Sequence, residues 1–423
     1  MRRNAWLFLG LSGLLTLPAC SGADSSSSAS GPFSSSGAAT AVGGASQSSG
    51  GASAKGGNKG DSPNLVGSGG ANQSETGGST DTGAAAGANV PAPVTWNSAK
   101  SATLTDVQLQ AEYTAWKLAH VQSCSNGSWV VVKDNTALSE GIGYGMLLAV
   151  AMADQTLFDG LWKYYQDHLD KNGLMNWTTG ICDAPGNDNT NAATDGDLDT
   201  AMALVQAAAR WPSGGYLPKA QALASKIAQF ESDMCSGRRV LKPGDAFGGC
   251  TDPNDQRINP SYFSPGYYKV FAHYFADQAT TWTELVDGSY QLYAIYQARL
   301  DDLVPDWSGP DGSDNGSGYS YDACRTPWRV AVDYAWSGDT RAKTFMQNIS
   351  SWVDGHGGLP AAAQAQNSAF VGAFALAGGY DQGKFDGYMG AWLGATLDDA
   401  PYYQGTLRVL YLLVAAGKFS STL

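Results

Sequence analysis

The feature that most constrains the fold is a long succession of helical patterns. Between residues 93 and 423, apolar residues recur at helical spacing, and Gly, Pro, Asn and Asp cluster between the repeats. The spacing predicts helices over 107–120, 143–152, 157–169, 197–210, 218–235, 265–277, 281–300, 327–336, 340–353, 368–377 and 404–416. Strand-like alternation is rare, and 129–132 is its clearest example. We therefore predict an all-α fold, for which a closed barrel of helical hairpins is a suitable architecture, although periodicity does not by itself require closure.

The N-terminal part of the chain has a different composition. Residues 21–92 are almost entirely Ser, Gly, Ala, Thr and Asn, with Phe33 as the only aromatic residue. Such a segment cannot bury enough apolar area to offset its conformational entropy. We expect a disordered linker over 21–92 and one large domain over 93–423.

The first 20 residues have the order of an export signal. A basic pair, Arg2 and Arg3, precedes an apolar run and then small residues up to Cys20. The run is too short to cross a bilayer. Because Cys20 follows Ala19, the site also resembles a bacterial lipoprotein cleavage site, whose acylated thiol would anchor the chain to the outer membrane. Pro18 is unusual there, so plain secretion stays open, and we expect a secreted or cell-surface protein.

Cysteine and charge content narrow the classes further. Five cysteines follow Cys20, and an exported chain would form two disulfides, for which we prefer Cys235–Cys250 and Cys124–Cys182 among several pairings. Cysteine and histidine spacing does not indicate zinc, and we expect no metal and no cofactor. The net charge of −13 argues against nucleic acid as a partner but not against a neutral polymer.

Three acids, Asp195, Asp197 and Asp199, crowd the start of one predicted helix. Carboxylates there are stabilised by the helix dipole, and N-capping by Thr194 or Asp195 would explain one acid but not three. A calcium loop is the other alternative. It fits poorly, because Thr200 and Gln206 stand where the turn Gly and the bidentate Glu belong.

Two further segments place charge at helix starts. Glu140 precedes a predicted helix whose first turn holds three glycines, although dipole compensation would also explain it. Asp322 and Arg325 lie in the loop before Pro327, where an ion pair that fixes the loop is the alternative. Aromatic residues that belong either to the core or to a sugar-stacking surface lie in or beside loops: Trp177, Phe247, Tyr262, Phe263, Tyr267, Tyr268, Tyr402 and Tyr403.

Carboxylates without a metal set, together with loop aromatics on an exported acidic chain, indicate hydrolysis of a glycosidic bond. That reaction needs one carboxylic acid to protonate the leaving oxygen and one carboxylate opposite it. The sequence has no nucleophile elbow, phosphate loop or His-rich metal motif that would support another chemistry.

At these same positions the chain resembles glycoside hydrolase family 8. The resemblance covers nearly all of the domain from about Trp96 and rests on segments 139–146, 193–211, 241–245, 259–263, 303–307 and 321–334. It implies an (α/α)6 barrel that cuts internal β-1,4 bonds with inversion. An inverting enzyme separates its two carboxyl groups by roughly 6.5–9.5 Å.

The resemblance also implies roles for single residues. Glu140 would be the general acid, kept protonated by desolvation or by the nearby charge of Asp195. Asp322 would be the general base, Asp195 would bind and help distort the sugar, and Tyr262 would help hold the nucleophilic water. Trp177, Arg325, Tyr402 and Tyr403 would line sugar subsites, and Phe247 replaces a Trp of close relatives, which should weaken stacking there.

The substrate is less constrained than the reaction. We favour cellulose and mixed-linkage β-glucan, since the matching segments look most like endoglucanases, and a chitosanase or xylanase of the same family is the alternative. A glycan-binding protein without activity is disfavoured because all three acids are present. A helical isoprenoid cyclase is disfavoured by the export signal and by the lack of a basic diphosphate-binding patch. We expect a monomer.

Overall fold

The computed structural model describes residues 95–182 and 191–421. The predicted signal peptide and linker lie outside the described residues, as does the start of the predicted domain. Within the described ranges, no helix is both long enough and apolar enough to span a bilayer.

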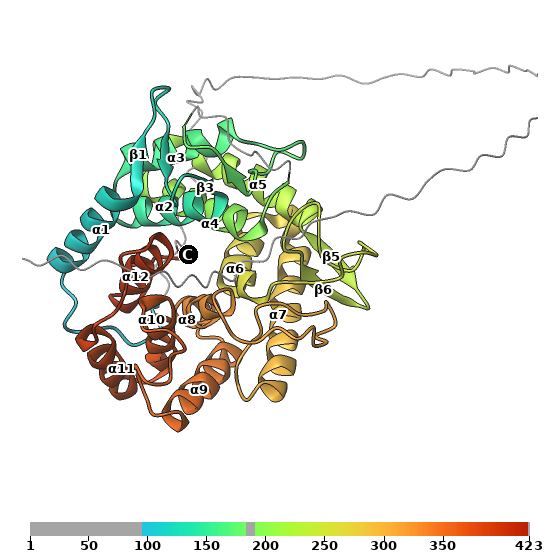
Figure 1. The fold of residues 1–423 in the computed structure, drawn as a ribbon. Coiled ribbons are helices and arrows are strands. Elements are labelled where there is room, and N and C mark those ends of the chain that lie inside the picture. Colours follow the sequence, from blue (N-terminus) through green and yellow to red (C-terminus); the bar gives the residue numbers. More distant parts are fainter. Residues whose placement is uncertain (1–94, 183–190, 422–423) are drawn as a thin grey trace, which may run out of the picture. The chain divides into compact units, whose positions relative to one another are not determined.

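The described part of the chain contains twelve α-helices. Their bounds are α1 (Asp106–His120), α2 (Ser139–Ala151), α3 (Gln155–Asp167), α4 (Thr194–Arg210), α5 (Tyr216–Phe230), α6 (Pro265–Tyr274), α7 (Ala279–Arg299), α8 (Thr326–Ser337), α9 (Thr340–Gly355), α10 (Ser368–Ala377), α11 (Gln382–Gly394) and α12 (Tyr402–Ala415). Figure 1 shows the even-numbered helices around the centre of the molecule and the odd-numbered helices outside them.

Burial separates the two rings of helices. All ten residues of α10 and 14 of the 17 residues of α4 are buried, whereas α1 buries three of 15 and α11 four of 13. Helices that are buried on nearly all sides belong to the inner ring, and helices with one buried apolar face cover them. The inner ring closes because α12 packs against α2. The fold is an (α/α)6 barrel, which confirms the predicted fold class.

The observed helices depart most from the prediction at three places. Helix α2 begins at Ser139 rather than 143, so Glu140 lies inside its first turn and not before it. Helix α11 was not predicted, because four glycines in its 13 residues obscure the apolar periodicity. Helix α5 ends at Phe230, since the following residues form a strand instead.

In the part of the chain that the structure describes, six short strands form three antiparallel pairs. They are β1 (Val121–Ser123) with β2 (Trp129–Val131), β3 (Ala137–Leu138) with β4 (Thr178–Thr179), and β5 (Ser232–Cys235) with β6 (Arg238–Leu241). Strand β3 directly precedes α2, and β4 follows α3 in the chain. Next to this pair, the backbone N–H of Ser139 donates to the carbonyl of Trp177 at 3.0 Å.

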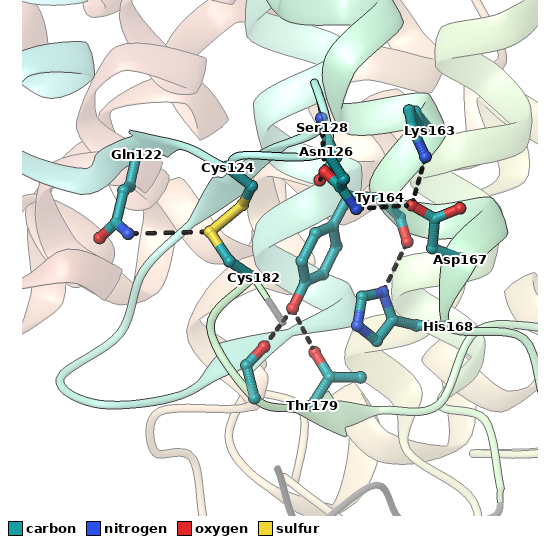
Figure 2. The surroundings of a disulfide bond; sticks show 11 residues. Gln122, Cys124, Asn126, Ser128, Lys163, Tyr164, Asp167, His168, Thr179 and Cys182 are labelled. Atoms are coloured by element: carbon teal, nitrogen blue, oxygen red, sulfur yellow. Dashed lines mark hydrogen bonds and ion pairs between the residues drawn. A yellow bond between two sulfur atoms is a disulfide. The ribbon is translucent and has the colours of Figure 1, made fainter. Parts of the chain in front are cut away.

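Both preferred disulfides are present. Cys124 and Cys182 are joined with a Cα–Cα distance of 5.3 Å, and Cys235 and Cys250 with 5.8 Å. Figure 2 shows that the first bond links the segment after β1 to the segment after β4. Cys324 keeps a free, buried thiol.

Candidate active site

The three acids at the start of α4 point in different directions. Because successive helical residues are about 100° apart, Asp195 and Asp199 share a face and Asp197 does not. Asp195 accepts from Arg325 Nη1 at 2.8 Å, and Asp199 binds both terminal nitrogens of Arg329 at 2.5 and 2.8 Å. Asp197 instead accepts from the Tyr165 hydroxyl and from the backbone of Met175.

This divergence decides between the alternatives for that segment. The acids do not converge as the ligands of a calcium loop would, so the calcium alternative is wrong. Side-chain capping does not explain them either, because Ala193 is the N-cap residue and no side chain caps the helix. The acids at positions 195 and 199 instead pair with two arginines four residues apart at the start of α8.

Glu140 is the second residue of α2 and lies beside the same arginine. Its Oε2 accepts from Arg325 Nη1 at 2.8 Å, and its Oε1 accepts from the Tyr402 hydroxyl at 3.0 Å. Gly141 makes room for that ring, since a Cβ at this position would lie 2.7 Å from the Tyr402 hydroxyl oxygen. The glycine next to Glu140 therefore permits the contact that holds its carboxyl group.

Asp322 reaches the same guanidinium from the loop before α8. Its Oδ1 accepts from Arg325 Nη2 at 2.8 Å, and its Oδ2 accepts from Trp307 Nε1 at 3.0 Å. The ion pair that we considered as an alternative for this loop is thus present. It is one part of a larger cluster rather than an isolated contact.

Arg325 is the centre of this cluster. Its side chain is 2% exposed, against 4% for Asp195, 16% for Glu140 and 33% for Asp322. Its Nη2 also donates to Ser261 Oγ at 2.9 Å, and the guanidinium lies 5.1 Å from the centre of the Tyr262 ring. Side chains of the protein therefore contact the Arg325 guanidinium from several sides. Arg325 thus connects the three acids, and its assignment to a sugar subsite stays a prediction.

The surroundings of the two buried acids favour a bound proton. Burial raises the pKa of Glu140 to about 7; the charge of Arg325 opposes this rise and the charge of Asp195 adds to it. Burial likewise raises the pKa of Asp195, against the effect of Arg325. Three carboxyl groups share one guanidinium, so a proton on one of them reduces the excess negative charge. The Glu140 carboxyl is thus a group that can hold a proton near neutral pH.

Two of the clustered acids, Glu140 and Asp322, open into a cavity of about 370 Å³, whose lining does not include Asp195. Its lining residues come from both ends of the chain: Lys133, Leu138, Glu140, Asp306, Ser320, Tyr321, Asp322, Arg325, Tyr403 and Gln404. A larger cavity of about 610 Å³ lies between α7 and α9 and contains none of the clustered acids. The smaller cavity is therefore the candidate active site.

Comparison with known proteins agrees with this geometry. The sequence profile of the family "Glycosyl hydrolases family 8" matches residues 88–415. The chain belongs to glycoside hydrolase family 8. It is similar to Endoglucanase A of Acetivibrio thermocellus, with 36% identity over 344 residues that span 74% of this chain and 70% of that protein.

Other relatives give the same family. Endoglucanase 2 of Ruminiclostridium josui is 37% identical over 58% of this chain and 54% of its own length. The apo structure of the beta-1,3-1,4-glucanase from Paenibacillus sp. X4 superposes with a TM-score of 0.66, at 26% identity, over 78% of this chain and 98% of that one. The family 8 chain is accordingly a glycoside hydrolase.

The family 8 structure divides the candidate aromatic residues into two groups. Phe263, Tyr267 and Tyr268 are at most 1% exposed and belong to the core. Tyr402 contacts Glu140, while Tyr403 lines the cavity and donates to the Tyr321 carbonyl at 2.6 Å. The sequence alone therefore did not distinguish the core aromatic residues from those at the cavity, since both kinds lie in or beside loops.

Three predicted subsite residues lie outside the cavity lining: Trp177, Phe247 and Tyr402. The Trp177 side chain is 40% exposed, and its backbone adjoins Ser139. Phe247 is half-buried, and its ring occupies the space that a Cβ at Gly244 would need. Their assignment to sugar subsites stays a prediction.

Sequence reasoning gave no role to several residues of the site of this family 8 protein, including the four that follow. Lys133 and Asp306 line the cavity, Ser261 accepts from Arg325, and Trp307 donates to Asp322. Segments 259–263 and 303–307 were recognised as family motifs, and that was the available signal for Ser261, Asp306 and Trp307; Lys133 lies in neither segment. It did not assign a role to any of these side chains.

The described ranges contain one cluster of possible metal ligands, Asp233 with Cys235 and Cys250. The two sulfur atoms are joined to each other. A disulfide sulfur is not a thiolate, so this group does not have the donors of a metal site.

Proposed function

We propose that this chain is a secreted or surface-anchored endo-acting β-1,4-glucanase that hydrolyses cellulose and mixed-linkage β-glucan with inversion. One observation carries the proposal. A single buried guanidinium holds two carboxyl groups, Glu140 and Asp322, on its two terminal nitrogens. They differ in exposure, 16% against 33%, as an acid and a water-contacting base should.

Glu140 is the proposed general acid. Its pKa of about 7 keeps a substantial fraction protonated in neutral solution, so it can donate its proton to the leaving glycosidic oxygen. The bond between that oxygen and the anomeric carbon breaks as the proton is transferred. Protonation makes this oxygen a better leaving group, because it departs as an alcohol rather than as an alkoxide.

Asp322 is the proposed general base. As a carboxylate on the more exposed side of the site, it accepts a proton from a water that attacks the anomeric carbon from the opposite face. The new carbon–oxygen bond inverts the configuration and yields an α-anomer. Arg325 holds both groups in place without gaining or losing a proton.

Asp195 and the aromatic residues would bind the sugar. The charge of Asp195 helps to keep Glu140 protonated, and its carboxyl group would bind and distort the sugar at the cleavage point. Tyr262 would help hold the nucleophilic water. Trp177, Phe247, Tyr402 and Tyr403 would form the walls of neighbouring subsites.

The proposed substrate rests on the relatives. The similar proteins are named endoglucanases, and that of Niallia circulans is named a beta-glucanase at 33% identity. A xylanase from Teredinibacter turnerae is only 18% identical, so this likeness supports the fold alone. The proposed location rests on the export signal in residues 1–20, with anchoring through Cys20 as the surface-attached alternative.

The test compares the full chain with its Glu140→Gln variant. Reducing-sugar release is measured on carboxymethylcellulose, barley β-glucan, xylan and chitosan, and the product anomers are followed by NMR. We expect glucan cleavage with the α-anomer formed first. The variant should lose at least about 10³-fold in kcat and still bind oligosaccharide, because it keeps the shape of the side chain but has no proton to donate.

Glu284→Gln is the matched control. Glu284 also accepts from an arginine, Arg239 at 2.7 Å, but lies on α7 outside the cavity. It should retain full activity. Faster cleavage of chitosan or xylan than of glucan would overturn the substrate assignment, and near-normal turnover by Glu140→Gln would overturn the proposed acid.

A further inference from the structure

We infer that Trp307 is a positioning residue for the water-activating carboxylate. This inference rests on the proposed function, since it concerns how Asp322 is aimed at water. The indole N–H of Trp307 donates to Asp322 Oδ2 at 3.0 Å, while Arg325 holds Oδ1 at 2.8 Å. Two donors on two oxygens fix the plane of the carboxylate, and each oxygen keeps a second acceptor site for water.

Asp322 needs such fixing more than the other acids do. Its side chain is 33% exposed, whereas that of Asp195 is 4% exposed and is confined by its surroundings. A partly exposed carboxylate held at one oxygen would rotate about its terminal torsion, which is broad. The contact with Trp307 removes this freedom on the side away from the arginine.

Trp307 is itself held from two directions. The Arg257 guanidinium lies 4.6 Å from the centre of the indole ring, and Arg257 pairs with Asp255 at 2.9 Å. The residues that follow each partner, Ile258 and Ser308, exchange backbone hydrogen bonds of 2.8 and 3.1 Å. The ring is therefore anchored by a stacked cation and by a local backbone bridge.

The residue before Trp307 organises the backbone around Asp322. Asp306 Oδ1 accepts from the backbone N–H of Ser320 at 3.0 Å and of Ala323 at 2.7 Å, one on each side of Asp322. Its own N–H donates to the Gly318 carbonyl at 2.9 Å. The pair Asp306–Trp307 thus sets both the backbone and the side chain of the proposed base.

Several charged or titratable groups surround this carboxylate and contribute to its electrostatic environment. Trp307 is uncharged, so replacing it removes a hydrogen bond and leaves the set of charges unchanged. The groups around Asp322 are Arg325, Asp306, Asp195, Glu140, Tyr262, Cys324 and Lys133.

Trp307→Phe tests the inference in the full chain, because it keeps an aromatic ring and removes the N–H. We expect kcat on barley β-glucan to fall about tenfold, with KM changed less than twofold. The acidic limb of kcat against pH should move to higher pH. The reason is that the carboxylate anion loses a donor and is protonated more easily.

Trp162→Phe is the matched control. Trp162 is a partly buried indole on α3, and its N–H has no acceptor among the described residues. This variant should keep the wild-type kcat and acidic limb. Arg257→Met is a milder second variant, since Arg257 is 48% exposed, and it should shift the acidic limb in the same direction by a smaller amount.

The outcomes distinguish a failure of the proposed function from a failure of the positioning role of Trp307. A wild-type chain that cleaves no β-glucan would refute the proposed function whatever the variants do. An active wild type with a Trp307→Phe variant that matches Trp162→Phe would refute the positioning role. A rise in KM alone would assign Trp307 to sugar stacking, and a fall in kcat with an unmoved acidic limb in both variants would make its role structural.

Discussion

At the scale of single residues, the site depends on the balance between Arg325 and three carboxyl groups. A buried guanidinium is tolerated only when it is paired and hydrogen-bonded, and here its partners are Asp195, Glu140 and Asp322. Three acids on one cation leave an excess of negative charge. Burial is the main physical reason why Glu140 can keep a proton near pH 7; the charge of Arg325 opposes it, and the charge of Asp195 adds to it.

The hydroxyl of Tyr402 opposes the rise in the pKa of Glu140. A variant without this hydroxyl should therefore shift that pKa in a known direction. The hydrogen bond from the hydroxyl to Glu140 Oε1 lowers the pKa of Glu140. Tyr402→Phe should therefore raise that pKa above about 7, so the acid stays protonated to higher pH. We expect the alkaline limb of the kcat–pH profile on β-glucan to move to higher pH.

Tyr113→Phe serves as the control for this change. The Tyr113 hydroxyl on α1 also donates to a carboxylate, at 2.8 Å, but to that of Asp154, the N-cap residue of the outer helix α3. The alkaline limb of the kcat–pH profile of Tyr113→Phe should equal that of the wild type. A limb that moves to lower pH in Tyr402→Phe would contradict the assignment of Glu140 as the acid.

At the scale of elements, the close packing of α2 and α4 brings the acids within reach of one arginine. A Cβ at Gly143 on α2 would lie 2.8 Å from the Gly196 carbonyl oxygen and from Asp199 Cβ on α4. A Cβ at Gly196 would meet Ser139 in the same way. Glycines on both helices thus allow the contact that carries Glu140 toward Asp195.

Gly143→Ala should separate these helices. Because backbone lies in the way of the added methyl group, we expect the free energy of unfolding to fall by about 1–3 kcal/mol. The kcat should also fall, since Glu140 and Asp195 move with their helices. Urea unfolding and β-glucan hydrolysis by the same preparation measure both effects.

Gly387→Ala is the comparison for that experiment. Gly387 lies in α11, and a Cβ there has open space around it. Alanine should stabilise this helix by roughly 0.5–1 kcal/mol and leave kcat unchanged. Equal effects of the two substitutions would show that helix propensity, and not the α2–α4 approach, controls the outcome.

At the scale of the whole molecule, buried acids behind the site link stability to pH. Burial raises the pKa of Asp197 to about 8 and that of Glu231 well above its usual range. A carboxyl whose pKa is raised on folding binds more protons in the native state than in the unfolded state. Its contribution to stability is complete below the unfolded pKa, near 4, and is lost as the pH rises through the native value.

We therefore expect the melting temperature of the full chain to fall as the pH rises from about 5 to 8. Asp197→Asn should reduce this slope, because the amide oxygen can still accept from Tyr165 and Met175 but does not ionise. Calorimetry over that range measures both slopes. A slope that is equal in the two proteins would show that Asp197 does not carry the effect.

The sequence by itself was enough to predict most of the helices. Apolar spacing located eleven of the twelve helices, because a helix that packs on a core must repeat apolar residues along one face. Proximity in the chain also favoured the pairing of Cys235 with Cys250, which are 15 residues apart. The apolar spacing failed at α11, where glycines obscure the pattern, and at the β5–β6 pair, where four-residue strands resemble the end of a helix.

The sequence also identified Glu140, Asp195 and Asp322 as candidate site residues, because they lie in recognisable segments. Only the tertiary structure decided what they contact. Arg325 bonds partners 130 and 185 residues away, and the indole that orients Asp322 belongs to a different loop. Local patterns reflect the periodicity of one element. Ion pairs across the barrel depend on how separate helices pack, and that is a property of the closed ring of helices.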